Sequence, residues 1–177
     1  PVALSDDARA RIVRCREYLD RKMEHPERPI YGITTGFGSL CDISVGRDEL
    51  AQLQRNLVMS HACGTGERVP SEIVRLILLL KIQSLSYSHS GVQLATSGDL
   101  APLAHMSLPL LGLGEVECEG RVRPASEVLG ELGWKPLELQ SKEGLALLNG
   151  TQFMAAYGVW ALLAARRLSG WADRIGA

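Results

Sequence analysis

A glycine-rich stretch near the N-terminus carries the first residue suited to chemistry. Tyr31 stands at the entrance of residues 31–38, where three glycines and two adjacent threonines make a poor helix. Glycine permits a close backbone approach, and a phenol can exchange a proton with a bound molecule. The stretch lacks the Gly-Lys-Ser/Thr ending of a phosphate loop. By itself, such a turn with a half-buried tyrosine is more often structural than catalytic.

Two polar residues end an apolar helical pattern further along the chain. Ser60 and His61 follow the leucines of residues 50–57 and precede the glycine-rich residues 63–66. A histidine at the end of a helix is usually a hydrogen-bonded cap. Because neighbouring side chains diverge on a helix, we do not expect Ser60 and His61 to form a nucleophile pair.

Two further segments interrupt their surroundings with small and polar residues. Ser97, Gly98 and Asp99 precede a helical pattern, and Asp99 suits the N-cap of that helix. Asn149 and Gly150 break a strongly apolar run. A polar break in a buried run costs stability unless the asparagine is hydrogen-bonded. From composition alone, a structural and a functional role for Asn149 are equally supported.

The elements that must position these residues are mostly helical. Helical patterns begin at Ser5, Leu50, Pro70, Asp99, Pro124 and Ser141. The pattern that begins at Pro70 is apolar nearly all round, which predicts a buried helix. Residues 115–123 alternate about Glu119-Gly120, which predicts a short β-hairpin. The predicted fold class is therefore mainly α, with one short β-hairpin.

Composition limits the partners and the compartment. The 177 residues are 46% hydrophobic, which is enough for the core of a single domain. Lys and Arg total 19 against 20 Asp and Glu, and this balance argues against a nucleic acid partner. Polar residues interrupt every apolar stretch before it could span a bilayer, so we expect no membrane partner. The cysteines are widely spaced, without a CxxC pair, which predicts a cytoplasmic protein with no metal site.

Four segments together resemble the aromatic amino acid ammonia-lyase family, which includes histidine, phenylalanine and tyrosine lyases and related aminomutases. The segments are Tyr31–Gly38, Asn56–Gly66, Ser97–His105 and Gly144–Gln152, and they follow the family's order. The match extends over nearly the whole chain. The resemblance implies that residues 1–177 form the N-terminal, electrophile-bearing part of a helical subunit, truncated relative to the whole.

The resemblance also implies a cofactor that the chain makes from itself. In the family, an Ala-Ser-Gly triad cyclises autocatalytically to a methylidene-imidazolone ring (MIO), with no external cofactor. Ser97 and Gly98 match the second and third triad positions. The serine hydroxyl is eliminated to form the methylidene, and glycine leaves room for ring closure. The first position contributes mainly its carbonyl group, so Thr96 is its candidate.

The remaining roles implied by the resemblance concern the substrate, a small amino acid. Tyr31 matches the base that removes the β-proton, and Asn149 matches the asparagine that holds electrophile and substrate. Ser60 and His61 match the pair that faces the substrate's ring. Phenylalanine and tyrosine lyases usually carry Phe-Leu or His-Leu there, whereas imidazole needs polar partners. The Ser-His pair therefore implies a carbon–nitrogen lyase that converts L-histidine to trans-urocanate and ammonia.

Two departures from the family pattern leave alternatives open. Thr34 stands where histidine lyases typically have asparagine, and a threonine at this position is more similar to phenylalanine lyases. A phenylalanine or tyrosine lyase, or an aminomutase, is therefore an alternative. A block of about thirty residues, longer than an ordinary connection, is missing before Ser97. We favour a further segment between Thr96 and Ser97 over a continuous Thr96-Ser97-Gly98 triad.

A third hypothesis is a non-catalytic fragment that acts as an assembly module. The resemblance implies a homotetramer with each active site built from several subunits. The apolar run from Leu145 to Leu168 agrees with this, because exposed apolar area of such extent usually marks an interface. We therefore expect the 177-residue piece alone to associate and to be inactive.

Overall fold

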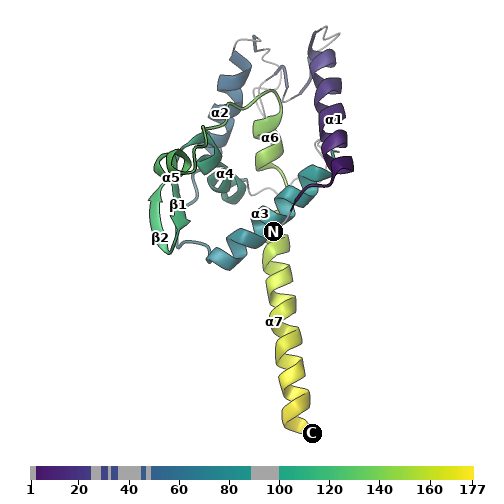
Figure 1. Cartoon of the computed structure of the whole chain (residues 1–177), viewed down its shortest axis with the longest axis vertical. Coiled ribbons are helices and arrows are strands. Elements are labelled where there is room, and N and C mark those ends of the chain that lie inside the picture. Colours follow the sequence, from purple (N-terminus) through teal and green to yellow (C-terminus); the bar gives the residue numbers. More distant parts are fainter. Residues whose placement is uncertain (1–2, 25–28, 32, 36–44, 47–48, 89–99) are drawn as a thin grey trace.

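The computed structural model describes residues 3–24, 29–31, 33–35, 45–46, 49–88 and 100–177. Its elements, in chain order, are α1 (Asp6–Glu24), α2 (Leu50–His61), α3 (Ser71–Ser86), α4 (Ala101–Ser107), the 3-10 helix η3 (Leu108–Leu111), β1 (Glu115–Cys118), β2 (Arg121–Pro124), α5 (Ala125–Glu131), α6 (Glu143–Leu148) and α7 (Gln152–Gly176). The prediction of a mainly α fold with one β-hairpin is confirmed. Figure 1 shows α7 projecting as a single rod below the other elements.

The first helix begins where its capping residue predicts. The Ser5 hydroxyl oxygen accepts a hydrogen bond from the Ala8 backbone N–H at 3.2 Å. Asp6 and Asp7 occupy the first turn, where the helix dipole favours acidic side chains. The buried residues of α1 are Ala8 and Met23, so the helix covers the fold with only part of one face.

The hairpin forms around the predicted dipeptide. β1 and β2 pair antiparallel, with Cys118 opposite Arg121. Glu119 and Gly120 have φ values of 52° and 74°, as the tight turns of hairpins require. Arg123 of β2 donates a hydrogen bond of 2.8 Å to Glu131, which ties the hairpin to the end of α5.

The main core lies between α2, α4 and α6. Its buried members are Leu57, Val58, Ala104, Leu111, Leu139, Leu145 and Leu148. The two helices α2 and α6 run in the same direction in Figure 1. They approach closely because residue 144 is a glycine, where a Cβ would lie 2.7 Å from the Gln54 carbonyl oxygen. The Gly144 backbone N–H donates to the Gln54 side chain at 2.9 Å, which fixes the register of the two helices.

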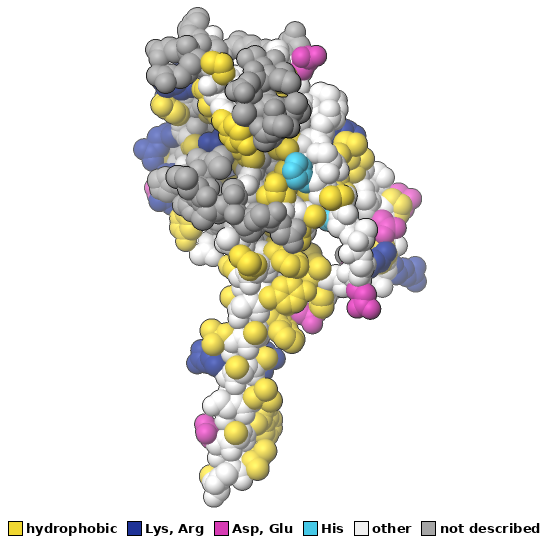
Figure 2. Space-filling model, turned by 180° about the vertical axis from the view of Figure 1, so that it is seen from behind, with side chains coloured by type: hydrophobic (Ala, Val, Ile, Leu, Met, Phe, Trp, Pro, Cys, Tyr) yellow, Lys and Arg dark blue, Asp and Glu magenta, His cyan; other side chains and the backbone are white. Residues whose placement is uncertain are grey.

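The helix predicted to be buried all round is buried on one face only. Ile73, Ile77 and Lys81 of α3 are buried, at the four-residue spacing of a single helix face. Leu78, Leu79 and Ile82 are 41–50% exposed. In this chain α3 packs mainly against α7, and Figure 2 shows hydrophobic side chains on the surface over α7. The apolar pattern correctly predicts a helix, but the prediction that this helix is buried on all sides is wrong.

The start of α6 also differs from the prediction. The sequence pattern predicts that this helix begins with Ser141 as its N-cap, but Lys142, with a left-handed φ of 72°, occupies the N-cap position. The Glu143 carboxylate accepts a hydrogen bond of 2.7 Å from the Gln140 N–H, while the Ser141 carbonyl accepts one from Arg16. The N-cap of α6 therefore lies one residue later than predicted. The predicted cap Asp99 lies outside the described residues.

None of the helices that the structure describes combines the length and the apolar character needed to cross a membrane.

Candidate functional site

The last turn of α2 holds the Ser-His pair against one backbone carbonyl. His61 Nδ1 lies 2.8 Å from the Leu57 carbonyl oxygen, and the Ser60 hydroxyl donates to the same oxygen at 3.1 Å. The Ser60 oxygen also lies 3.2 Å from His61 Nδ1. The prediction that these two side chains diverge is therefore wrong. Because a carbonyl can only accept, Nδ1 must carry the proton, and Nε2 is then the acceptor nitrogen of the neutral ring.

This tautomer decides what the pair can do chemically. A base for the Ser60 hydroxyl would need a lone pair on the nitrogen that faces it. Nδ1 faces Ser60 but is committed as a donor to Leu57. That Ser60 and His61 do not form a nucleophile pair stays a prediction, and the placement of this proton now supports it in place of diverging side chains. The pair instead offers Nε2 of His61 as a polar contact for a bound molecule.

Asn149 occupies the break between α6 and α7. It is the C-cap of α6, in extended conformation with φ −79° and ψ 134°. Its backbone N–H and its side-chain Nδ2 each donate to the Leu145 carbonyl oxygen at 3.0 Å. The hydrogen bonds of the described residues leave Oδ1 and the second amide proton of Asn149 available. The polar break is thus satisfied locally and still has hydrogen-bonding capacity to spare.

The helix pairing brings His61 and Asn149 to the same end of the core. His61 is the last residue of α2, and Asn149 directly follows α6. The two helices run in the same direction and are locked in register by the Gln54–Gly144 hydrogen bond. Two of the segments singled out from the sequence therefore converge through packing.

Tyr31 lies at the opposite end of α2. The turn that carries it packs through Ile33 against Leu50, the first residue of α2, and against Met23. Twelve helical residues separate the ends of α2 by about 16 Å. Tyr31 is 54% exposed in the described part of the chain. The chain thus does not bring Tyr31 together with His61 and Asn149.

Thr34 has a local role in closing the turn that holds Tyr31. Its hydroxyl oxygen accepts a hydrogen bond from the Ile30 backbone N–H at 2.9 Å. Its carbonyl oxygen accepts one from the Val45 N–H, also at 2.9 Å. The side chain at position 34 is therefore occupied by the backbone of its own turn.

The electrophile positions cannot be placed beside these residues. Thr96, Ser97 and Gly98 lie outside the described residues. In the ranges that are described, no group of three or more His, Cys, Asp or Glu side chains could hold a metal ion.

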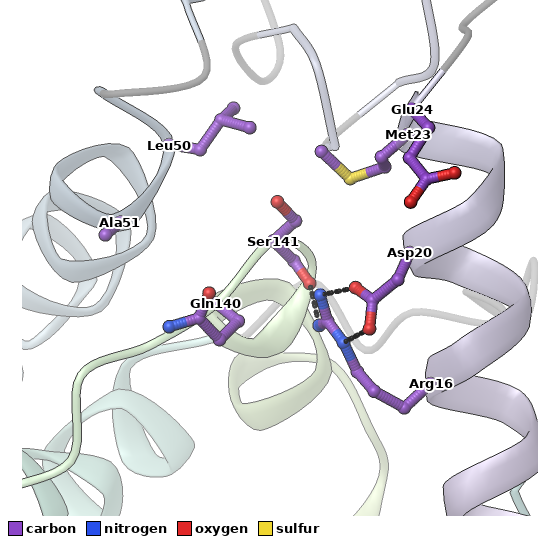
Figure 3. A pocket seen from close by; sticks show the side chains of 8 residues that line it. All are labelled: Arg16, Asp20, Met23, Glu24, Leu50, Ala51, Gln140 and Ser141. Carbon is purple, nitrogen blue, oxygen red and sulfur yellow. Dashed lines mark hydrogen bonds and ion pairs between the residues drawn. The ribbon is translucent and has the colours of Figure 1, made fainter.

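A hollow near α1 contains none of the predicted site residues. It has a volume of about 330 Å³ and lies between α1, the start of α2 and residues 140–141 (Figure 3). Arg16 pairs with Asp20 and donates a hydrogen bond of 3.2 Å to the Ser141 carbonyl oxygen. The hydrogen bond from Arg16 holds the pKa of Asp20 below its ordinary value. This hollow therefore marks where α1 is tied to the segment before α6.

Sequence reasoning missed one group that contacts the candidate site. Lys81 of α3 donates a hydrogen bond of 2.7 Å to the backbone oxygen of Asn149. The side chain is buried, and this burial lowers the pKa of Lys81 from 10.5 to about 8. The available signal was a single lysine inside the apolar run of residues 76–82. Its position on the buried face follows from its four-residue spacing after Ile73 and Ile77.

Comparison with known proteins identifies relatives along the whole chain. A family model described as aromatic amino acid lyase matches residues 1–97 and 94–177. Histidine ammonia-lyase of Deinococcus radiodurans is 47% identical over 196 aligned residues, covering 97% of this chain and 37% of the relative. Histidine ammonia-lyase of Symbiobacterium thermophilum is 44% identical, covering 97% and 38%. The chain thus spans little more than a third of the length of these curated relatives.

Solved structures agree with the sequence comparison. The crystal structure of histidine ammonia-lyase from Trypanosoma cruzi matches with a TM-score of 0.82 and 36% identity, covering 94% of this chain and 37% of that one. Phenylalanine aminomutase of Pantoea agglomerans matches with a TM-score of 0.84 and 30% identity, covering 95% and 37%. The resemblance read from the four segments is confirmed: the chain belongs to the aromatic amino acid lyase family.

Proposed function

We propose that the protein carrying this chain is a carbon–nitrogen lyase that converts L-histidine to trans-urocanate and ammonia. The observation that carries the proposal is the polar end of α2. There His61 is held by the Leu57 carbonyl with Nε2 as its acceptor nitrogen, at the end of the core that also holds Asn149. An imidazole substrate has an N–H that such an acceptor can bind, whereas an apolar pair would leave it unpaired. The names of the two bacterial relatives support the same substrate.

The electrophile is proposed to come from Ser97 and Gly98, with either Thr96 or a residue of a further segment between Thr96 and Ser97 in the first triad position. The MIO ring would supply the electrophile that makes the amine a better leaving group. Asn149 suits a role beside it, because its Oδ1 and second amide proton can bind both the ring and the substrate. The Asn149 Nδ2 donates a hydrogen bond of 3.0 Å to the Leu145 carbonyl oxygen. This bond limits rotation of the Asn149 carboxamide.

Removal of the β-proton is assigned to Tyr31. Phenols are mostly protonated at neutral pH, so the complete site must favour the phenolate. Tyr31 lies one helix length from His61 within this chain, at the far end of α2. We propose a homotetramer in which each active site is assembled from several subunits. The scattered cysteines support a cytoplasmic location for this assembly.

A phenylalanine or tyrosine lyase, or an aminomutase, is the second candidate. Thr34 favours it, as does the structural match to a phenylalanine aminomutase. The bond from Ile30 to the Thr34 hydroxyl weakens that argument, because it gives Thr34 a role in the turn that is independent of substrate. Histidine therefore remains the first choice.

The test uses the full-length gene product that contains these residues. It is supplied with L-histidine, L-phenylalanine or L-tyrosine, and the absorbance of urocanate, cinnamate or coumarate is followed. We expect urocanate alone, and an intact mass below the sequence mass by two water molecules. Turnover of only phenylalanine or tyrosine would contradict the substrate assignment.

The Ser97→Ala variant tests the electrophile. Alanine has no hydroxyl to eliminate, so the mass deficit and the activity should both disappear while the fold survives. Ser126→Ala, at an exposed position of α5, is the matched control and should keep both. Full turnover by Ser97→Ala would exclude the cyclised electrophile.

A further inference from the structure

The centre of α3 buries a lysine where its neighbours are apolar. The Lys81 side chain is only 4% exposed, although lysine is almost never fully buried unless it is paired. The ion pairs found in the described parts of the chain all join partly exposed side chains, and none involves Lys81. A buried cation without a counter-charge disfavours folding. Its presence is therefore better explained by what it contacts than by a contribution to stability.

What Lys81 contacts is the main chain of Asn149. Lys81 Nζ donates to the Asn149 carbonyl oxygen at 2.7 Å. The carboxamide of Asn149 is held from the other side, because Nδ2 donates to the Leu145 carbonyl oxygen. Each of these bonds restricts a different part of Asn149: the first its peptide plane, the second its side-chain rotation. With both in place, the orientation of Oδ1 is set.

A second bond from α3 holds the far side of the same break. Gln152, the first residue of α7, donates through Nε2 to the Ser84 hydroxyl oxygen at 3.0 Å. Ser84 in turn donates to the Lys81 carbonyl oxygen at 3.0 Å. Lys81 and Ser84 are three residues apart and so lie on one face of α3. This face therefore clamps the α6–α7 break at both of its ends.

We propose that Lys81 is a positioning residue for Asn149. Its bond to the Asn149 carbonyl fixes the α6–α7 break so that the Asn149 carboxamide meets the substrate and the electrophile in one orientation. The inference rests on the proposed function, because it takes the role of Asn149 from there. The lowered pKa of Lys81 agrees with this proposal, because buried ionisable groups with shifted pKa values are typical of functional sites.

The test replaces Lys81 in the full-length gene product. Lys81→Met has a similar length but neither a charge nor a donor, and Lys81→Gln is polar but too short to reach Asn149. If the variants acted through a packing defect, their activities would differ, because the two replacement side chains differ in size and polarity. If they act through loss of the contact with Asn149, both should lose activity to a similar extent. We expect kcat for histidine to fall by roughly 10- to 100-fold in both, because a small misplacement of a reacting group has effects of that size. KM should change by less than about threefold, and the MIO mass deficit should persist.

Two comparisons separate positioning from a general structural role. Lys135→Met removes an exposed lysine and should leave kcat and KM unchanged. Lys81→Arg keeps a charged N–H donor and should recover most of the lost kcat. Equal kcat in Lys81→Met and Lys135→Met would overturn the inference, as would losses in Lys81→Met and Lys81→Gln that differ by more than tenfold.

Hydrogen exchange gives a readout that does not need activity. Peptides covering residues 149–152 should exchange faster in Lys81→Met than in Lys135→Met, because one clamp of the break is lost. If the parent protein turns over none of the three amino acids, the proposed function fails. Hydrogen exchange at residues 149–152 then decides by itself whether Lys81 holds the α6–α7 break. If the parent is active but exchange at 149–152 is unchanged, the proposed function stands and the role of Lys81 is refuted.

Discussion

The short helix α6 and the long helix α7 come from one apolar run but have opposite surroundings. Within α6, Gly144, Leu145 and Leu148 are buried. Within the 25 residues of α7, the buried residue that the structure describes is Ala156. Leu148 has 0% of its surface exposed and Leu168 has 70%. Similar sequences on the two sides of Asn149 thus differ almost completely in burial.

The difference follows from what each helix packs against. α6 lies between α2 and α4 and shares their core. α7 contacts α3 near its start, through residues such as Phe153 and Ala156, and then extends away from the other elements (Figure 1). Hydrophobic side chains continue along that extension in Figure 2. An apolar helix pattern therefore indicates that cover is needed, without indicating which part of a protein provides it.

The largest effect should come from the core side of the break. Leu148→Ala removes buried methyl groups between α2 and α6, and we expect the free energy of unfolding to fall by roughly 2–5 kcal/mol. Denaturant unfolding of parent and variant measures the difference. A loss below about 1 kcal/mol would mean that α6 does not pack in the core as the structure shows.

A somewhat smaller effect should appear at Lys81, on the helix that joins both regions. Its pKa is about 8 when folded and 10.5 as the ordinary value, so the unfolded chain binds more protons between these two pH values. The free energy of unfolding contributed by Lys81 should therefore rise as pH increases from 8 to 10.5, by up to about 3 kcal/mol. Below pH 8 the full cost of burying the charge is present.

The measurement compares unfolding of the parent and of Lys81→Met across this pH range. Because the variant lacks the titrating group, the difference between the two should change with pH by that amount. A difference that is constant with pH would contradict the burial of Lys81 as a free amine. It would also weaken the contrast between a buried and an exposed face of α3.

The smallest effect on stability should come from the exposed part of α7. In the 177-residue chain, Leu168→Ala should change the free energy of unfolding by less than about 0.5 kcal/mol, because Leu168 contacts little within the chain. Self-association, measured by sedimentation, should decrease, since the variant removes exposed apolar area. A loss comparable to that of Leu148→Ala would erase the distinction between the two helices.

The local structure could be predicted from the sequence because its causes are local. Ser5 caps α1 through a bond to a residue three positions away, and Glu119-Gly120 turns the hairpin through its own backbone. The break at Asn149 is satisfied by Leu145, within the same helical turn. Such contacts lie a few residues apart and are therefore visible in short patterns. The four family segments likewise identified the family without a structure.

Tertiary structure decided which predicted residues meet and which groups are buried. The Ser141 carbonyl accepts a hydrogen bond from Arg16, 125 residues away. Lys81 gained its contact with Asn149 across 68 residues. Hydrogen bonds and burial at such separations depend on how whole helices pack, and a periodic pattern reports only that a helix has an apolar face.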